Sequence, residues 1–550
     1  MRPIVTTTVL LVLAVSGLRA QVPADLVVYG RVWTGDTARP WADAVAVRGE
    51  RIVAVGTRAE VRRLVGPRTR VLDNGSALVT PGLADAHTHF VAGGVQLVSV
   101  DLRDAASPGE FLRRIAAFAR TLPAGQWVTG GRWDHERWPG SPLPRREWLD
   151  SVIPNTPVFV NRLDGHMGVA NSLALRLAHI SRDTPDPPGG LIVRDSVTGE
   201  PTGVLKDNAQ GLMGAAIPPL TAQQDDSALE RAMHYAASLG VTQVHSMGTW
   251  EDFATFRRAR ARGTMITRVR AYVPMPTWRQ LADTVLAVGR GDAWLSWGGL
   301  KGYMDGSLGS MTAAFYEPYR NATTRGLLVT DSARRRQEVL GADSVGLQIA
   351  THAIGDRANA MILGFYEEAA REHGPRDRRA RVEHAQHLRQ QDIPRFGSLG
   401  VIASVQPSHL TDDGRWAASR LDTARLLGTY PFRTLLDTGA RLAFGSDWSV
   451  ATLDPIQGIY AAVTRRTSDD KNPGGWFPAQ KIALDEALRA YTAGVAYAGF
   501  LEDRLGVLRP GMLADITLID RDLFAIPAEQ IALAHAKATI VGGRVVYSRR

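Results

Sequence analysis

The chain has 550 residues, of which 45% are hydrophobic and 22% charged, ordinary proportions for a folded globular protein. Its formal net charge of +9 comes from Arg spread over predicted helices rather than from one basic block, so no nucleic-acid partner is expected. The sequence contains no Cys, which excludes disulfides, a Cys-linked lipid anchor and thiolate metal ligands.

The first 20 residues have the layout of a secretory signal peptide. One basic residue near the start, Arg2, is followed by an uncharged run from Pro3 to Leu18 and by the small residue Ala20. The run is short for a membrane span, which needs ~20 apolar residues. We therefore expect cleavage near Ala20, secretion or export to the periplasm, and no stable membrane insertion of the mature chain.

Short β-like runs separated by turns occupy both ends of the mature chain. Residues 21–80 alternate such runs with turns, and residues 505–550 do the same in "GVLRPGMLADITLID" and "KATIVGGRVVYS". Two β-rich ends that flank a long middle segment predict one small β-sandwich domain built from both termini.

The middle segment, residues 81–504, alternates strand-like and helix-like patterns. Its eight strand-like runs cover residues 77–89, 241–247, 266–273, 299–305, 346–352, 380–386, 401–407 and 441–447. Repeated βα units of this number predict an α/β protein with a closed (β/α)₈ TIM barrel. Residues 97–220 interrupt the pattern after the first strand. We assign them to a large insertion with two further strand-like runs, at 126–134 and 157–166.

Side chains with metal-ligand chemistry recur at the ends of five of these strands. They are His87 and His89, Lys301, His352, His384, and Asp447. The carboxyl ends of barrel strands form one rim, where barrel enzymes hold their active sites. Alternate residues of a strand point to the same side, so both histidines of the first strand can face this rim. Imidazole and carboxylate groups suit Zn²⁺ and similar divalent ions.

Each candidate has a less specific explanation when it is taken alone. His352 or His384 fits a hydrogen-bonded structural histidine, and Asp447 fits a turn or a helix cap. Lys301 fits an ion pair with Asp305, yet only five of the 64 basic residues are Lys. Lys, unlike Arg, has an amine that can lose its proton and react. The combination favours a metal site, because each residue falls independently at the same end of a strand.

Several segments resemble the amidohydrolase superfamily of metal-dependent hydrolases. They are "TPGLADAHTH", "LKGYMDG", "THAIGD", "VEHAQ" and "GSDWSV", in that order. Three others, "DGHMGVANSLAL", "GEPTGVLKDNA" and "QPSHL", are similar to the branch that contains N-substituted formamide deformylases. The resemblance extends from Asp25 to the C-terminus and therefore covers nearly the whole mature chain.

This resemblance implies a binuclear metal centre. In binuclear members, a lysine of the fourth strand takes up CO₂ and becomes a carbamate that bridges two metals, which assigns that role to Lys301. The more buried metal would be held by His87, His89, Lys301 and Asp447, and the more exposed one by Lys301, His352 and His384. We expect two Zn²⁺, although other divalent metals fit the same ligands.

The resemblance further implies a hydrolase that uses a metal-activated water to cleave a carbon–nitrogen bond other than a peptide bond. The expected substrate is a small-molecule amide, of which an N-substituted formamide is one example. Asp447 is expected to be both ligand and general base. His166 and His409 are expected to donate to the carbonyl or its oxyanion, although each also fits a buried structural histidine.

Four tryptophans of the insertion allow two interpretations. They are Trp127, Trp133, Trp138 and Trp148. Either they line an apolar pocket over the barrel mouth, which would favour a bulky or aromatic N-substituent, or they pack in the insertion's own core.

Other functions remain open at this stage. The same centre serves hydrolases of cyclic amides, lactones, carbamates and esters, so the fold does not choose among them. A deaminase is less favoured, because that chemistry usually goes with one metal and no bridging lysine. Outside enzymes, the alternative is a secreted binding protein on a barrel scaffold, against which the complete ligand set argues. The sequence also leaves open whether the chain acts as a monomer or a homodimer.

Overall fold

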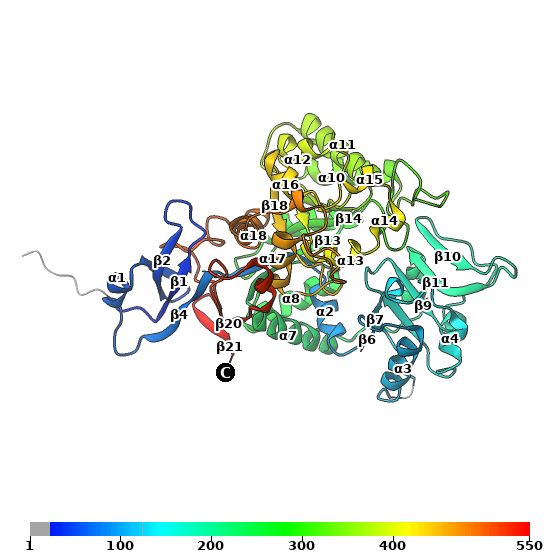
Figure 1. Ribbon diagram of the computed structural model, residues 1–550, viewed down its shortest axis with the longest axis horizontal. Coiled ribbons are helices and arrows are strands. Elements are labelled where there is room, and N and C mark those ends of the chain that lie inside the picture. The colour runs from blue at the N-terminus through cyan, green and yellow to red at the C-terminus, as the bar shows by residue number, and fades with distance from the viewer. Residues whose placement is uncertain (1–21, 124, 550) are drawn as a thin grey trace, which may run out of the picture.

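The computed structural model describes residues 22–123 and 125–549, so the expected signal peptide at residues 1–20 lies outside them. The strands of the described residues form three β-sheets. In Figure 1 they lie in a row, with the small β domain at the left, the barrel in the middle and the insertion at the right. Within the described ranges, no helix is long and apolar enough to cross a membrane.

Eight parallel strands form the central barrel. In chain order they are β5 (Leu83–Thr88), β12 (Val241–Met247), β13 (Arg268–Pro274), β14 (Leu295–Tyr303), β15 (Gln348–Ala353), β16 (Arg381–His384), β17 (Ile402–Val405) and β18 (Arg441–Phe444). The first and last strands meet through a parallel bridge between Thr88 and Trp448. Asp447 also donates its backbone N–H to the carbonyl of His87 over 2.7 Å. The predicted (β/α)₈ barrel is therefore confirmed.

Helices cover the outside of the barrel, and local sequence fixes their ends. For example, Thr249 caps the N-terminus of α8 (Trp250–Arg262), and Gly263 ends it at φ 69°, a conformation that Gly adopts without strain. The other helices around the barrel are α2 (Phe90–Gln96), α7 (Ala222–Ser238), α9 (Trp278–Val288), α10 (Ser332–Ser344), α11 (Asp356–His373), α12 (Ile393–Leu399), α13 (Pro407–Asp413), α14 (Ala417–Arg420), α15 (Thr423–Leu426), α16 (Phe432–Asp437), α17 (Pro455–Thr464), α18 (Leu484–Ala490) and α19 (Ala493–Ala498).

Both ends of the described chain contribute strands to one seven-stranded sheet, whereas the sequence predicts a β-sandwich. Its order is β21 (Arg544–Ser548), β20 (Ala536–Val541), β19 (Ile516–Ile519), β4 (Arg70–Pro81), β1 (Leu26–Trp33), β2 (Trp41–Arg48) and β3 (Arg51–Gly56). Val28 and Val45 belong to one apolar cluster, whereas their chain neighbours Val27 and Ala46 belong to another, together with Val61 of helix α1 (Arg58–Arg62). Because strand side chains alternate, the sheet buries residues on both faces.

The insertion contains a six-stranded sheet. Its order is β10 (Gly190–Arg194), β11 (Pro201–Asp207), β9 (Met167–Ala170), β8 (Phe159–Arg162), β7 (Gly130–Trp133) and β6 (Val100–Asp101). Its helices are α3 (Pro108–Ala119), α4 (Arg146–Asp150), α5 (Ser172–Leu177) and α6 (Gln210–Gly214). The two predicted runs correspond to β7 and β8. The other four strands escaped prediction, because they are two to seven residues long and two of them adjoin turns rich in Gly and Pro.

The four tryptophans of the insertion pack in its own core. Trp133 and Trp138 are stacked with ring centroids 6.1 Å apart and lie in one apolar cluster, against which Trp148 also packs. Trp127 packs against a second apolar cluster of the insertion. The interpretation that these residues line a pocket over the barrel mouth is therefore wrong, because burial against their own sheet removes their apolar area from water.

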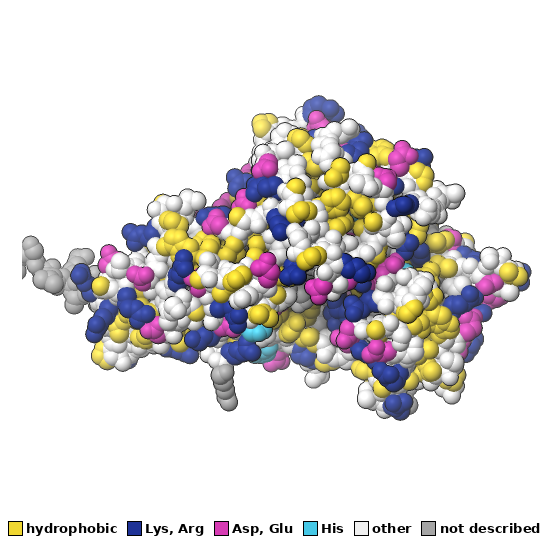
Figure 2. Space-filling model, viewed as in Figure 1, with side chains coloured by type: hydrophobic (Ala, Val, Ile, Leu, Met, Phe, Trp, Pro, Cys, Tyr) yellow, Lys and Arg dark blue, Asp and Glu magenta, His cyan; other side chains and the backbone are white. Residues whose placement is uncertain are grey.

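Basic and acidic side chains are interspersed over the face shown in Figure 2. Ion pairs between surface side chains are frequent in the described chain, such as Arg260 with Asp292 and Arg336 with Glu368. The net positive charge is therefore spread over this face of the molecule.

Candidate active site

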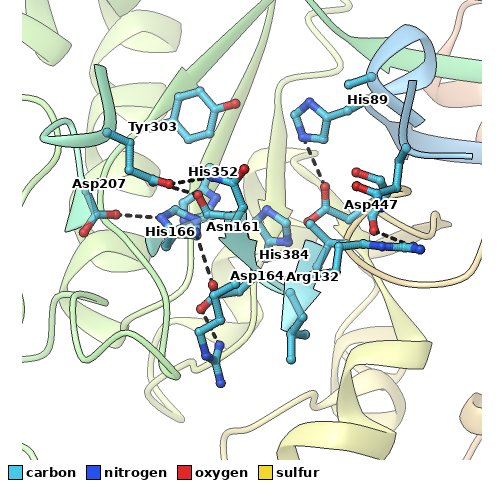
Figure 3. A pocket seen from close by; sticks show the side chains of 18 of the residues that line it. His89, Arg132, Asn161, Asp164, His166, Asp207, Tyr303, His352, His384 and Asp447 are labelled. Atoms are coloured by element: carbon cyan, nitrogen blue, oxygen red, sulfur yellow. Dashed lines mark hydrogen bonds and ion pairs between the residues drawn. The ribbon is translucent and has the colours of Figure 1, made fainter. Parts of the chain in front are cut away.

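The structure brings the six predicted metal ligands together at the carboxyl end of the barrel. Figure 3 shows four of them, His89, His352, His384 and Asp447. His87 lies in β5, His89 precedes α2, Lys301 lies in β14, His352 lies in β15, His384 ends β16, and Asp447 follows β18 by three residues. All except His87 line one cavity of about 400 Å³, and His87 is fully buried beside them. Residues from five strands therefore converge on one site.

The tightest group consists of His87, His384 and Asp447. One ligand atom from each lies within 4.8 Å of the other two, and all three residues are buried. His89 extends the group, because its Nε2 lies 3.2 Å from Asp447 Oδ1. The arrangement offers three imidazoles and a carboxylate to one small volume.

Hydrogen bonds from the far side of each ring orient two of these imidazoles. His87 Nδ1 donates to Glu383 Oε2 over 2.6 Å, and His384 Nδ1 donates to Gln406 Oε1 over 2.7 Å. The Gln406 amide is itself fixed, because its Nε2 donates to the carbonyl of Ser404. Each neutral ring then carries its lone pair on Nε2, which faces the group. Partners of this kind raise the metal affinity of a site.

Glu383 was not predicted from the sequence. It directly precedes His384, and ordinary strand alternation would send the two side chains to opposite sides. His384 instead adopts φ 75°, in the left-handed region that non-Gly residues rarely occupy. This backbone turn brings both side chains to the interior, where each contacts the His87 ring. Strain of this kind clusters at functional sites.

Arg381 anchors Glu383 below the ligands. Its guanidinium donates to both carboxylate oxygens of Glu383, over 2.7 and 3.0 Å, and to His245 Nδ1 over 2.8 Å. Although burial raises the pKa of Glu383, the charge of Arg381 and the hydrogen bond from His87 lower it to about 2. Glu383 is therefore an anion that can only accept from His87, and His245 belongs to this supporting layer.

Lys301 is buried and does not form the alternative ion pair with Asp305. Its Nζ lies 3.0 Å from His87 Nε2 and 4.7 Å from the ring centre of Tyr303. Asp305 instead accepts the backbone N–H groups of Ala314, Ile354 and Gly355. Burial lowers the pKa of the Lys301 amine to about 8, so a neutral, reactive form is accessible near neutral pH.

The protonation states of the other proposed ligands suit the binding of a cation. Burial and then the Lys301 charge lower the pKa of His87 to about 4, and burial holds the pKa of His384 well below its usual value. Burial alone would raise the pKa of Asp447, but His87 and His89 hold it well below its usual range. Neutral imidazoles and an ionised carboxylate are the forms that bind metal ions.

His352 stands slightly apart from the tightest group. Its ring centre lies 4.5 Å from that of His384, but its Nε2 lies 3.0 Å from the carbonyl oxygen of Gly306, to which it donates. Burial holds its pKa well below the usual value, so the ring is neutral and Nδ1 is the nitrogen left to bind a second ion.

Comparison with known proteins identifies the family. The sequence matches the Amidohydrolase family over residues 70–547. The chain belongs to this family. The resemblance drawn from the sequence motifs is therefore confirmed, and with it the class of metal-dependent hydrolases.

Relatives of this amidohydrolase align along nearly their whole length. It is 39% identical over 543 residues to Protein LONG AFTER FAR-RED 3 of Arabidopsis thaliana, an alignment that covers 96% of this chain and 92% of the relative. It is 30% identical to the N-substituted formamide deformylase of Arthrobacter pascens, with coverage of 95% and 98%. The crystal structure of an uncharacterized metal-dependent hydrolase from Pyrococcus horikoshii OT3 matches with a TM-score of 0.73 and 26% identity, covering 92% of this chain and 99% of that structure.

A divalent cation fits the donor set of this amidohydrolase. Asp447 Oδ1 lies 3.4 Å from His87 Nε2 and 3.2 Å from His89 Nε2, yet it receives no aligned hydrogen bond from any described residue. A buried carboxylate oxygen without a partner is costly, and a metal ion would satisfy it. His89, 31% exposed at its side chain, keeps the group open to the cavity.

The two further candidates, His166 and His409, both border the ligands. His166 comes from the insertion, between β8 and β9; its Nδ1 lies 2.7 Å from Asp207 Oδ1, and its ring centre 4.9 Å from that of His352. Burial would lower the pKa of His166, but Asp207 raises it above the usual value. His409, in α13, is half-buried; its Nε2 lies 4.0 Å from Asp447 Oδ2 and has no hydrogen-bond partner among the described residues. Asp207 was not predictable from local sequence, because it lies 41 positions from His166 and meets it through the β9–β11 pairing.

Proposed function

We propose that this amidohydrolase hydrolyses the carbon–nitrogen bond of a small non-peptide amide, with N-substituted formamides as the substrate class. The observation that carries the proposal is the convergence of His87, His384 and Asp447 with Lys301 at one buried site. The name and full-length alignment of the Arthrobacter relative, an N-substituted formamide deformylase, favour the amide over other substrates.

The proposed centre holds two Zn²⁺. His87, His89, Lys301 and Asp447 would bind one ion, and Lys301, His352 and His384 the other. Lys301 would bridge them as a carbamate, which forms when its neutral amine adds to CO₂ and releases one proton. When bound, the ions would lower the pKa of a water molecule towards 7 and polarise the substrate carbonyl.

The chain's own residues then move protons and stabilise charge. Asp447 is placed to accept a proton from the attacking water and to return it to the leaving nitrogen. His166 and His409 are placed on the cavity walls to donate hydrogen bonds to the carbonyl oxygen as negative charge develops on it. Asp207 fixes the His166 ring for this task through Nδ1.

Metal analysis and a product assay test the proposal together. Zinc-loaded protein is expected to contain close to two zinc ions per chain and to release formate and amine from N-substituted formamides. Removal of zinc with a chelator should abolish the reaction, and added zinc should restore it. Undiminished activity of the metal-free protein would refute the mechanism, and one zinc per fully active chain would refute the binuclear centre.

A further inference from the structure

Two cavities of very different size meet at the proposed metal centre. The larger, about 400 Å³, lies between the barrel mouth and the insertion, and the smaller, about 50 Å³, lies towards α13. His352, His384 and Asp447 border both cavities. The proposed metal ligands therefore lie at the junction of the two cavities.

Three bulky apolar side chains stand among the charged and polar groups that line the small cavity. Leu308 is 1% exposed and Ile354 is 5% exposed, and both belong to the main barrel core. Trp416, just beyond α13, completes the wall and places its ring 5.9 Å from the guanidinium of Arg162, which is itself buried. About 50 Å³ has room for only about two or three non-hydrogen atoms. Close-packed walls of this kind do not readily yield to a larger group.

Polar side chains of the insertion surround the large cavity. Asn161, Asn208 and Gln210 contribute side-chain amides, and Arg132 contributes a guanidinium whose Nε has no hydrogen-bond partner in the described chain. In Figure 3, Asn161 and Arg132 are both seen on the cavity wall. The insertion's four tryptophans are absent from this wall as described, because they are used in its core. The large cavity thus suits a substituent that forms hydrogen bonds.

The position of His409 tells the two cavities apart. His409 borders only the small cavity, and its unpartnered Nε2 lies on the Asp447 side of it. A carbonyl oxygen that accepts from this nitrogen lies beside the small cavity, and the carbonyl carbon lies next to it. Of the two groups on that carbon, the larger then fits only the large cavity, towards the insertion.

We propose that the small cavity receives the acyl group and the large cavity the nitrogen substituent. Leu308, Ile354 and Trp416 then limit the acyl group to formyl or acetyl, while the polar wall selects large amines with hydrogen-bonding groups. This inference rests on the proposed function of an amide hydrolase and adds the residues that set its substrate class.

An acyl series on one polar amine tests the size limit. The probes are the N-formyl, N-acetyl and N-butyryl amides of 6-amino-1-hexanol, hydrolysed by the zinc-loaded protein. We expect kcat/KM to fall at least about 100-fold from formyl to butyryl, since one misfit methylene alone costs about 10- to 200-fold. Replacing 6-amino-1-hexanol by methylamine in the formamide should not raise kcat/KM. Equal rates for formyl and butyryl, or a preference for the smaller amine, would overturn the assignment.

Two variants that enlarge the small cavity test which side chains limit the size of the acyl group. Trp416→Ala and Ile354→Ala should each raise the butyryl-to-formyl ratio of kcat/KM by about 10-fold, because each removes side-chain volume from the small cavity. Two variants are used in case one fails to fold. Trp41→Ala is the matched control, because Trp41 lies in β2 of the small β domain, and its ratio should equal that of the wild type. A ratio unchanged in both folded enlarging variants would contradict the inference.

Binding of product carboxylates gives a readout that needs no turnover. Calorimetry on the zinc-loaded protein should show formate binding at least about 10-fold tighter than butyrate, and Trp416→Ala should reduce this difference. If no amide is hydrolysed but the carboxylates show this size limit, the proposed reaction fails and the cavity assignment stands. If amides are hydrolysed without regard to acyl size, the reaction stands and the cavity assignment fails.

Discussion

Replacing Glu383 by Gln removes the buried charge beneath the proposed metal ligands while it keeps the shape of the side chain. The carboxylate is fully buried and accepts from His87 over 2.6 Å and from Arg381 over 2.7 and 3.0 Å. Gln has one acceptor oxygen and one donor nitrogen, so it cannot accept from both partners in the same way. Either His87 loses the bond that orients it or Arg381 loses a partner.

Replacing Glu383 by Gln should change both the free energy of unfolding and the affinity for zinc. Removing one partner from a buried ion pair costs about 3–5 kcal/mol, because it leaves the Arg381 guanidinium in the barrel interior without its counter-charge. Loss of the hydrogen bond that orients a ligand histidine lowers metal affinity about 10- to 100-fold. The variant should therefore be both less stable and weaker in zinc binding.

Urea unfolding of the metal-free protein and zinc titration against a competing indicator measure the two effects. Glu502→Gln is the matched control, because Glu502 forms a bidentate pair with Arg379 but is 41% exposed at its side chain. A pair of that exposure contributes at most about 1 kcal/mol, and zinc affinity should not change. If Glu383→Gln matches this control in both measurements, the role assigned to Glu383 is wrong.

Three further predictions concern charge, pH and packing. Lys301→Ala and Lys301→Arg should each lower bound zinc from two ions to one and reduce hydrolysis at least about 100-fold, because neither residue forms a carbamate. Metal analysis and the product assay measure the two effects. Two zinc ions retained in either variant would contradict the bridging role of Lys301. Burial, with the Arg425 charge, lowers the pKa of His387 to about 3, below the ordinary 6.5, so its contribution to stability is full above pH 6.5 and is lost as pH falls towards 3. Between pH 7 and pH 5 the wild type should accordingly lose about 2 kcal/mol more unfolding free energy than His387→Asn in urea titrations, and equal losses would refute this. Trp133→Ala should destabilise the protein by about 3–5 kcal/mol in thermal unfolding, since Trp133 is fully buried. Trp41 is half-exposed, so the control Trp41→Ala should change the stability far less. Equal changes in stability would show that the insertion's core does not depend on Trp133.

The sequence predicted the parts of the site that follow from short-range periodicity. Strand alternation places His87 and His89 on one side, and the βα repeat places them at the same rim as His352 and Asp447. These are local regularities, and the structure brings the predicted residues together. The partners of the ligands were not predictable in this way. Glu383 reaches His87 only because His384 leaves ordinary strand geometry.

The insertion shows the limit of local reasoning most clearly. Its tryptophans fitted either a pocket over the barrel mouth or the insertion's own core, and the sequence does not state which surface covers them. The sheet from β6 to β11 supplies that surface, so the wall facing the barrel mouth is polar instead. The same sheet brings Asp207 to His166 across 41 positions of chain.

By itself, the order of strand-like runs and polar residues determined the barrel, the rim and the kinds of metal ligand, because hydrophobic periodicity and residue chemistry are properties of short segments. Only the tertiary structure decided which side chains support those ligands, and how the space around them divides into a narrow cavity and a wide one. Contacts between distant segments depend on how whole elements pack, and that packing is settled by the competition of all buried surfaces at once.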